Sequence, residues 1–381
     1  MATPDREGPF REAAFRDPAR ASAMSGAIAK AVSALGRSPV TVMHVCGSHE
    51  QAIAKYGLRA VLPRELHVIM GPGCPVCVTD APEVDEGVAL ALQGAHVATY
   101  GDMLRVPGSS LSLADAQAEG ARVHLVYSVD QAVGLARRIR GEVVFFATGF
   151  ETTAVATAAA VSRGVPSNFS ILCAHKYIPP AMDVVAGIPG SKVEGFLAAG
   201  HAATITGWSV FEPFVARHRL PVVVAGFEPL DILAALLRAV ERIRAGSPRV
   251  DNVYPRCVTK DGNRRAQEAM WRVFERADGR WRGIGEVPGG SLRLREAFGG
   301  LDARRRFAID ATGLPARTPR PDAAQCLCGA IMSGIASPGD CPLYADACTP
   351  EHPVGACMVS SEGTCRIWHE YGGHPDLGDI T

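Results

Sequence analysis

An alternation of short strand-like segments with helical segments constrains the fold of this chain more than any other feature. Segments rich in β-branched residues occur at residues 40–45, 66–70, 96–100, 122–128, 142–148, 169–174 and 221–225. Segments with helical periodicity lie between them, at residues 48–56, 81–92, 130–140, 152–162, 179–186 and 229–244. Such βαβ alternation predicts largely parallel sheets that are covered by helices on both faces.

The alternation restarts near residue 142, which predicts two similar parallel-sheet βαβ domains of the α/β class. Three strand-to-helix junctions, at residues 46–50, 148–151 and 225–228, each combine a glycine with an acidic residue in the first helical turn. Duplication and convergent junction chemistry explain this echo equally well. After residue 246 the chain is rich in Arg, Gly and Pro, with one helical pattern near 263–277. We therefore expect an N-terminal extension (1–35), two α/β domains (36–141 and 142–246) and a C-terminal domain (247–381).

The composition excludes several classes of protein. The 381 residues carry 39 Lys and Arg against 39 Asp and Glu, so the basic excess typical of electrostatic nucleic-acid binding is missing. No apolar segment reaches the roughly 18 residues that a membrane-spanning helix needs. The first 21 residues mix charges without an apolar core, so no secretory signal is expected. The sequence predicts a cytoplasmic protein with no nucleic-acid or membrane partner.

The 11 cysteines are unevenly distributed along the chain. Three lie early, at Cys46, Cys74 and Cys77, and six lie between Cys326 and Cys365. A cytoplasmic protein gains no structural disulfides from its surroundings, so this clustering indicates metal or redox chemistry. Four further candidates are interpreted as structural residues: Cys173, His175, His201 and Cys257.

Cys46 lies where a predicted strand ends and a predicted helix begins. Open α/β sheets bind ligands at the carboxyl ends of their strands, and a helix N-terminus favours the thiolate form of a cysteine. His49 and Glu50 stand within one helical turn and offer a second ligand and a proton carrier. The structural alternative is a small buried cysteine followed by a capping serine.

A rigid cysteine loop follows the next predicted strand, at residues 71–77 with the sequence GPGCPVC. The spacing of Cys74 and Cys77 suits a dithiol–disulfide pair or two metal thiolates. Consecutive strands of such a sheet are usually neighbours, so this loop and Cys46 should open onto the same edge. The alternative is a structural turn with incidental cysteines.

The cysteine-rich tail suits a metal cluster. It lacks regular periodicity, as expected where metal ligation replaces a hydrophobic core. Four thiolates would hold an iron–sulfur cluster or a zinc ion. Structural zinc sites usually show two tidy pairs of cysteines, which this spacing lacks, so we favour a smaller iron–sulfur domain. The six cysteines are Cys326, Cys328, Cys341, Cys348, Cys357 and Cys365.

Taken together, these motifs resemble the HypD family of [NiFe]-hydrogenase maturation proteins. The matching segments are CGSHE at 46–50, GPGCPVC at 71–77, TGFETT at 148–153, CPL at 341–343 and MVSSEG at 358–363. The resemblance spans about residues 36–371, and the motifs fall in the order of the family. It implies two similar α/β domains and a third domain that carries a [4Fe–4S] cluster.

The resemblance also implies a function. HypD proteins act with HypC as the scaffold on which a mononuclear iron becomes the Fe(CN)2CO unit, with cyanide accepted from HypE. The hydrogenase large-subunit precursor is a further partner through HypC. Carried over to this chain, Cys46 is an iron ligand, and Cys74 and Cys77 are the thiol pair beside it. These three cysteines are the implied metal-binding residues and, with His49 and Glu50, the implied catalytic residues.

The tail cysteines divide into two groups under the same resemblance. The cluster environment of the family looks like that of ferredoxin–thioredoxin reductase, in which a cluster adjoins a disulfide. The implied cluster ligands are Cys328, Cys341, Cys348 and Cys365, and the implied redox pair is Cys326 and Cys357.

Two other functions fit the same residues. One is a thiol–disulfide oxidoreductase resembling ferredoxin–thioredoxin reductase, with no mononuclear iron. The other is a zinc-stabilised binding module without redox activity. The favoured interpretation is a redox-active scaffold for metal-centre assembly rather than a stand-alone turnover enzyme.

Overall fold

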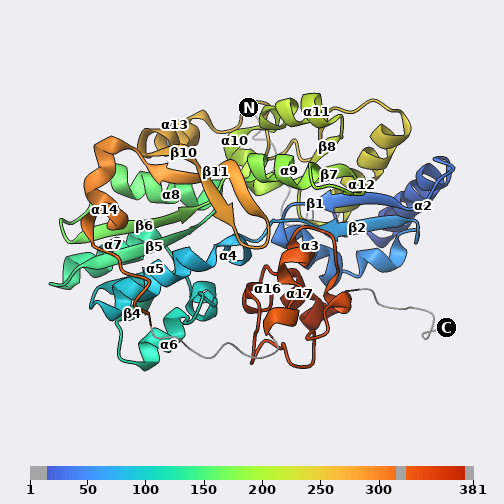
Figure 1. The fold of residues 1–381 in the computed structure, drawn as a ribbon. Coiled ribbons are helices and arrows are strands. Elements are labelled where there is room, and N and C mark those ends of the chain that lie inside the picture. Colours follow the sequence, from blue (N-terminus) through green and yellow to red (C-terminus); the bar gives the residue numbers. More distant parts are fainter. Residues whose placement is uncertain (1–14, 315–322, 374–381) are drawn as a thin grey trace, which may run out of the picture.

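A computed structural model describes residues 15–314 and 323–373 and contains two parallel sheets side by side (Figure 1). The first sheet has the strand order β2-β1-β7-β8-β9, and the second has the order β4-β3-β5-β6. The first sheet consists of β1 (Val40–His44), β2 (Leu66–Met70), β7 (Val193–Ala199), β8 (Val222–Ala225) and β9 (Val250–Asn252). The second consists of β3 (His96–Thr99), β4 (Val123–Leu125), β5 (Val143–Gly149) and β6 (Phe169–His175). All pairings within both sheets are parallel, which confirms the predicted α/β class.

The strands of the two sheets interleave along the chain. After β1 and β2 the chain leaves the first sheet, builds the whole second sheet with β3 to β6, and returns to the first sheet as β7. The predicted ranges 36–141 and 142–246 therefore each contribute strands to both sheets and do not separate them. Periodicity indicates which segments are strands, whereas their partners depend on which apolar faces bury each other.

Helices cover the two sheets and agree well with the helical periodicity. Helices α5 and α12 have the predicted bounds, and α3 begins one residue before the predicted segment. The predicted N-terminal extension contains α2, which Asp17 caps by accepting the Ala19 amide, whereas residues 1–14 lie outside the described residues. The helices over residues 15–306 are α2 (Pro18–Ser33), α3 (Gly47–Lys55), α4 (Pro75–Val78), α5 (Ala81–Leu92), α6 (Leu113–Ala118), α7 (Val129–Arg138), α8 (Glu151–Ser162), α9 (Ile178–Ala186), α10 (Gly200–Thr206), α11 (Glu212–His218), α12 (Pro229–Arg244), α13 (Arg264–Val273) and α14 (Ala303–Arg306).

Burial explains why strands β1, β5, β6 and β8 are mostly apolar. Every residue of β1, β5, β6 and β8 is buried, as expected for parallel strands that are covered on both faces. Phe145 and Phe146, adjacent in β5, are both fully buried and point to opposite faces of the second sheet. Side chains of this size each contribute about 1.5–3 kcal/mol when they are buried.

The C-terminal range 247–381 contributes to several parts of the molecule. Strand β9 completes the first sheet, and α13 packs on α8. The predicted helix at 263–277 ends at Val273, because Phe274 begins β10 (Phe274–Trp281) of an antiparallel hairpin with β11 (Gly285–Leu294). This hairpin, orange in Figure 1, packs along β6 and reaches toward the junction of the two sheets.

The cysteine-rich tail is a small, mostly irregular region beneath this junction (Figure 1). It contains α15 (Cys328–Met332), α16 (Ala356–Val359) and α17 (Thr364–Tyr371). Helix α17 packs on α3, and α16 packs on α4. None of the helices in residues 15–314 and 323–373 is long and apolar enough to cross a membrane.

Candidate functional site

The first sheet has a topological switch point between β1 and β7. From β1 the chain continues to β2 on one side, and from β7 it continues to β8 on the other side. Connections that diverge in this way open a crevice at the carboxyl ends of the strands, where α/β proteins bind ligands. Cys46 follows β1 and caps α3, and His201 follows β7 as the second residue of α10. The Cys46 Sγ lies 3.9 Å from the His201 Nδ1, so the two strand ends place a thiol and an imidazole in contact.

The Cys46 side chain is almost completely buried, with an exposed fraction of 1%. Burial raises the pKa of the Cys46 thiol to about 12, and this outweighs the amide hydrogen bonds from His49 and Ser48 that lower it. The helix terminus therefore does not make Cys46 a thiolate, contrary to the expectation from the sequence. Cys46 is a neutral thiol at physiological pH.

The GPGCPVC loop lies directly against Cys46. The amide of Gly47 donates to the Gly73 carbonyl oxygen over 3.1 Å, and the Gly71 amide donates to the His44 carbonyl oxygen over 2.8 Å. A Cβ atom on Gly73 would lie 2.1 Å from the Cys46 backbone nitrogen, so only glycine fits there. The neighbouring β1 and β2 thus bring both cysteine motifs to one edge of the sheet, as their order along the chain predicts.

Cys74 and Cys77 are joined by a disulfide in this structure. Cys74 caps α4, and its sulfur also accepts the Cys77 amide over 3.1 Å. Both residues are buried. The disulfide beside Cys46 can therefore accept two electrons and become two thiols. It could bind a metal only after this reduction, because thiolates rather than disulfide sulfurs are metal ligands.

His49 is buried between aromatic rings near the switch point. Its Nε2 lies 3.4 Å from the Ala225 carbonyl oxygen, and its ring centroid lies 5.1 Å from that of Phe227. Burial, together with the nearby His44 and His201, lowers the pKa of His49 to about 3, so the ring is neutral. Its Nδ1 is buried without a hydrogen-bond partner among the described residues.

Glu50 belongs to a buried ion cluster with Arg59, His44 and Trp368. Its carboxylate accepts two hydrogen bonds from the Arg59 guanidinium, over 2.8 and 2.7 Å, and one from the Trp368 indole over 2.5 Å. His44 Nε2 lies 2.8 Å from the same carboxylate. Burial alone would raise the pKa of Glu50, but Arg59 and His44 hold it well below its usual range. This geometry makes Glu50 an anchor between α3 and α17.

All six tail cysteines line one small cavity. Five of them are buried and Cys326 is half-buried. The Cys365 amide donates to the Cys357 sulfur over 3.3 Å, and the Val354 amide donates to the Cys348 sulfur over 3.3 Å. A Cβ atom on Gly355 would lie 2.9 Å from the Cys326 sulfur. These features fit an iron–sulfur cluster: cysteine sulfurs line the cavity, a glycine leaves room beside them, and backbone amides donate to two of the sulfurs. The reduction potential of such a cluster depends on hydrogen bonds of this kind.

The described residues contain no group of three or more His, Cys, Asp or Glu side chains arranged around a single metal ion. The tail sulfurs line one shared pocket, in which Cys328 interacts with Cys326 and Cys357, and Cys357 interacts with Cys365.

The tail cavity adjoins the disulfide. The Cys77 sulfur lies 3.9 Å from the carbonyl oxygen of Ala356, and the next residue, Cys357, lines the cavity. On the other side, a Cβ atom on Gly47 would lie 2.5 Å from the Glu362 Cβ, so the tail also touches the start of α3. The tail cavity, the disulfide and Cys46 thus occupy one continuous region, with a single residue of backbone between the cavity and the disulfide.

The structure changes the interpretation of several other residues. His201, interpreted as structural from the sequence, contacts Cys46. The sequence signal that could have identified it is the apolar segment before Gly200, which forms strand β7 and was not recognised as a strand. Cys173 donates to the Leu292 carbonyl oxygen over 3.1 Å inside the core, which confirms its structural role. Cys257, also interpreted as structural, is exposed.

Fold and site together define a thiol-rich α/β protein. The model of the HypD family, described as "Hydrogenase formation hypA family", matches residues 19–372. Hydrogenase maturation factor HypD of Azotobacter vinelandii is 42% identical over 371 residues, covering 94% of this chain and 96% of the relative. The same-named proteins of Cupriavidus necator and Rhizobium leguminosarum are also 42% identical, over 88% and 94% of this chain and 90% and 95% of the relatives. The chain belongs to the HypD family.

Proposed function

We propose that this protein is a maturation factor for [NiFe] hydrogenase that serves, with HypC, as the scaffold for assembling the Fe(CN)2CO unit. The observation that carries the proposal is the continuous region formed by Cys46, the Cys74–Cys77 disulfide and the tail cavity. Membership of a family whose relatives are named hydrogenase maturation factors supports it.

The iron under assembly is the substrate, and Cys46 is its proposed ligand. Low-spin iron with cyanide ligands favours soft thiolate donors, which Cys46 supplies at the switch-point crevice. His201 lies beside the sulfur and can contact the iron or its ligands from the opposite wall. The buried crevice keeps bulk water away from the iron.

Cyanide release requires two electrons, and the cysteine pair beside Cys46 can supply them. HypE is the proposed cyanide donor and carries the group as a thiocyanate on a cysteine. Two thiols of Cys74 and Cys77 reduce this thiocyanate to a thiol and hydrogen cyanide, and they become the observed disulfide. Each turnover then ends with the pair oxidised and in need of reduction.

The tail cavity supplies the reducing side of the proposed cycle. Cys328, Cys341, Cys348 and Cys365 are the proposed ligands of a [4Fe–4S] cluster, with Cys326 and Cys357 as the accompanying redox pair. Bound there, such a cluster supplies electrons one at a time. The short path through Ala356 leads from the cavity to Cys77, so the disulfide can be returned to two thiols by two electrons and two protons.

The proposed partners follow from this chemistry. They are HypC, HypE and, through HypC, the hydrogenase large-subunit precursor, all in the cytoplasm. The balanced charge of the chain supports neither nucleic-acid nor membrane partners. The protein acts as an assembly scaffold and not as an enzyme that turns over alone.

A second candidate function is a thiol–disulfide oxidoreductase resembling ferredoxin–thioredoxin reductase. The contact between the disulfide and the tail cavity is compatible with this function as well, because both functions need electron transfer to that disulfide. The two differ at Cys46, which only the assembly scaffold requires.

Infrared spectroscopy of the anaerobic complex with HypC tests the proposal. We expect cyanide and carbonyl stretching bands in the wild-type complex and their loss in Cys46→Ser, with iron and acid-labile sulfide in the tail unchanged. Cys173→Ser is the matched control, because Cys173 is buried in the core and distant in function. Full bands in Cys46→Ser would contradict the proposed iron site, and a wild-type complex without bands would favour the oxidoreductase.

A further inference from the structure

The turn of the β10–β11 hairpin packs against the helix that begins at Cys328. A Cβ atom on Gly283 would lie 2.5 Å from the Cα of Gly329, so the two glycines are in backbone contact. The Ser333 hydroxyl donates to the Gly283 carbonyl oxygen over 3.3 Å. The turn therefore has a fixed position against α15 and the tail cavity.

Arg282, the residue before Gly283, joins this turn to the end of the cysteine loop. Its amide donates to the Val78 carbonyl oxygen over 2.9 Å, and its Nε donates to the Thr79 carbonyl oxygen over 2.8 Å. Its Nη2 donates to the Pro107 carbonyl oxygen over 2.6 Å. The guanidinium is thus held by uncharged carbonyl groups, and the nearby carboxylates of Asp80, Asp85 and Glu83 form no ion pair with it among the described residues.

The charge of Arg282 lies close to the tail cysteines. Burial lowers the pKa of Arg282, and Cys328, Asp80, Asp85 and Glu83 lie near enough to oppose this effect. An arginine side chain stays protonated in proteins, so a permanent positive charge adjoins the cavity. Cys328 is one of the proposed cluster ligands, and α4, which carries Cys77, ends at the carbonyl groups that hold Arg282.

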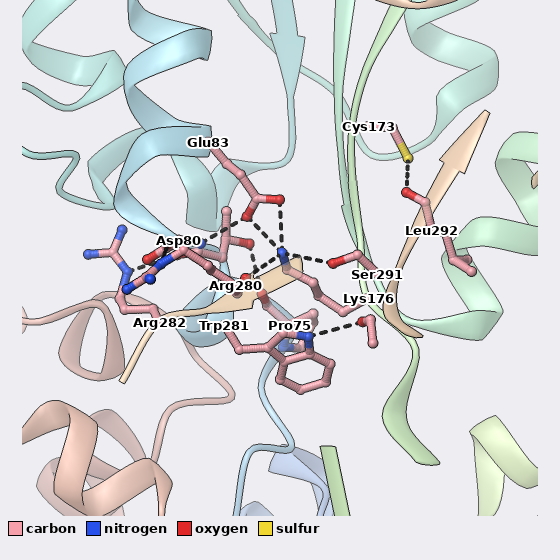
Figure 2. Close-up of polar contacts among 12 residues, drawn as sticks. Pro75, Asp80, Glu83, Cys173, Lys176, Arg280, Trp281, Arg282, Ser291 and Leu292 are labelled. Carbon is pink, nitrogen blue, oxygen red and sulfur yellow. Dashed lines mark hydrogen bonds and ion pairs between the residues drawn. The ribbon is translucent and has the colours of Figure 1, made fainter. Parts of the chain in front are cut away.

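Contacts of the two preceding residues, Arg280 and Trp281, hold Arg282 at its position beside the tail cavity (Figure 2). Trp281 stacks on Phe150 with ring centroids 5.8 Å apart. Lys176, fully buried, donates to the Arg280 carbonyl oxygen over 3.0 Å and to Glu83 over 2.8 Å. Contacts on both sides of Arg282 therefore fix the backbone that carries it.

We propose that Arg282 is a positioning residue that sets the reduction potential of the group bound in the tail cavity and holds the cysteine loop next to it. The inference rests on the proposed function, because it takes the tail cysteines to hold an iron–sulfur cluster. Reduction adds negative charge to a cluster, and a fixed nearby cation stabilises that state most where water is scarce. Arg282 thus favours electron uptake from a donor.

The test compares the cluster potential in Arg282→Gln, Arg282→Lys and the control Arg280→Gln by an anaerobic redox titration followed by electron paramagnetic resonance. Arg280 is the matched control because its side chain is 62% exposed and pairs with Asp80 at 3.2 Å. For Arg282→Gln we expect the reduced-to-oxidised ratio to fall at least tenfold at a fixed potential, which is about 59 mV for one electron. Arg282→Lys and Arg280→Gln should stay close to wild type.

Iron and acid-labile sulfide are measured in every variant, so that a change in potential is distinguished from loss of the cluster. Arg282→Met, which keeps the apolar stem, replaces Arg282→Gln if the latter does not fold. An unchanged potential in the folded neutral variant, or an equal fall in Arg280→Gln, would overturn the inference while leaving the proposed function intact. A wild-type protein that binds no iron and sulfide when both are supplied under anaerobic conditions would overturn both the inference and the proposed function.

Discussion

Replacing Glu50 with glutamine tests whether this residue anchors the tail or carries protons at the site. In the structure its carboxylate neutralises Arg59, whose side chain is only 4% exposed. Glutamine has the same shape but leaves that guanidinium buried without a counter-charge. Breaking a buried pair in this way costs about 3–5 kcal/mol. We therefore expect Glu50→Gln to lower the free energy of unfolding by that amount.

The matched control is Arg163→Gln, which removes an exposed ion pair with Asp130. Their side chains are 60% and 67% exposed, so the loss should be below about 1 kcal/mol. Urea denaturation followed by circular dichroism measures both variants. Equal losses of stability in the two variants would refute the anchoring role. A Glu50→Gln protein of full stability whose complex with HypC lacks the cyanide and carbonyl bands would refute it too, and would favour a catalytic role.

The Glu50 anchor also predicts a pH dependence. The folded-state pKa of Glu50 is held below its usual value, first by Arg59 and then by His44, against the opposing effect of burial. Its contribution is therefore complete above the unfolded pKa of about 4.3 and is lost as the pH falls toward the lower folded pKa. Unfolding measured between neutral and acidic pH should show a smaller acid-dependent loss in Glu50→Gln than in wild type. Because Trp368 donates to the same carboxylate, hydrogen exchange in α17 should also rise in this variant.

Three further predictions concern the cysteine motifs. Gly73→Ala forces a Cβ to within 2.1 Å of the Cys46 nitrogen, so we expect thermal unfolding to show a loss of at least about 1–3 kcal/mol in the free energy of unfolding. The control Gly26→Ala, whose added Cβ would have nothing within 4 Å, should leave this free energy unchanged or raise it slightly. Alkylation followed by mass spectrometry should label Cys74 and Cys77 only after both reduction and unfolding, because the pair is disulfide-bonded and buried; labelling of either residue without a reductant would contradict the disulfide. Cys341→Ala and Cys348→Ala should each lose the visible iron–sulfur absorption of anaerobically prepared protein and become protease-sensitive in the tail, and retention of all iron and sulfide in both would contradict their assignment as ligands.

The sequence predicts individual elements of this protein far better than their pairing. The helical periodicity of residues 81–92 predicts α5 to the residue, and in the structure Glu83 accepts the Asp80 amide at its start; such local signals need no tertiary context. Strand β7 was missed because Glu194 and Gly195 interrupt its apolar pattern, and it is a strand because it fills the space between β1 and β8. Missing β7 also hid His201, which the switch point brings to Cys46.

The interleaved chain explains why the three cysteine motifs meet. If residues 36–141 and 142–246 had formed separate sheets, the loop after β2 would have faced only its own domain. Instead, the chain passes from β2 through α4 and α5 into the second sheet, so the Cys74–Cys77 disulfide lies at the crossing between the two sheets. The tail packs α16 on α4 and α17 on α3 at this crossing, and the β10–β11 hairpin, which packs along β6, places Arg282 on the same loop. Backbone hydrogen bonds hold the disulfide loop against the Cys46 segment at this crossing, which makes it the part of the fold on which the proposed chemistry depends most.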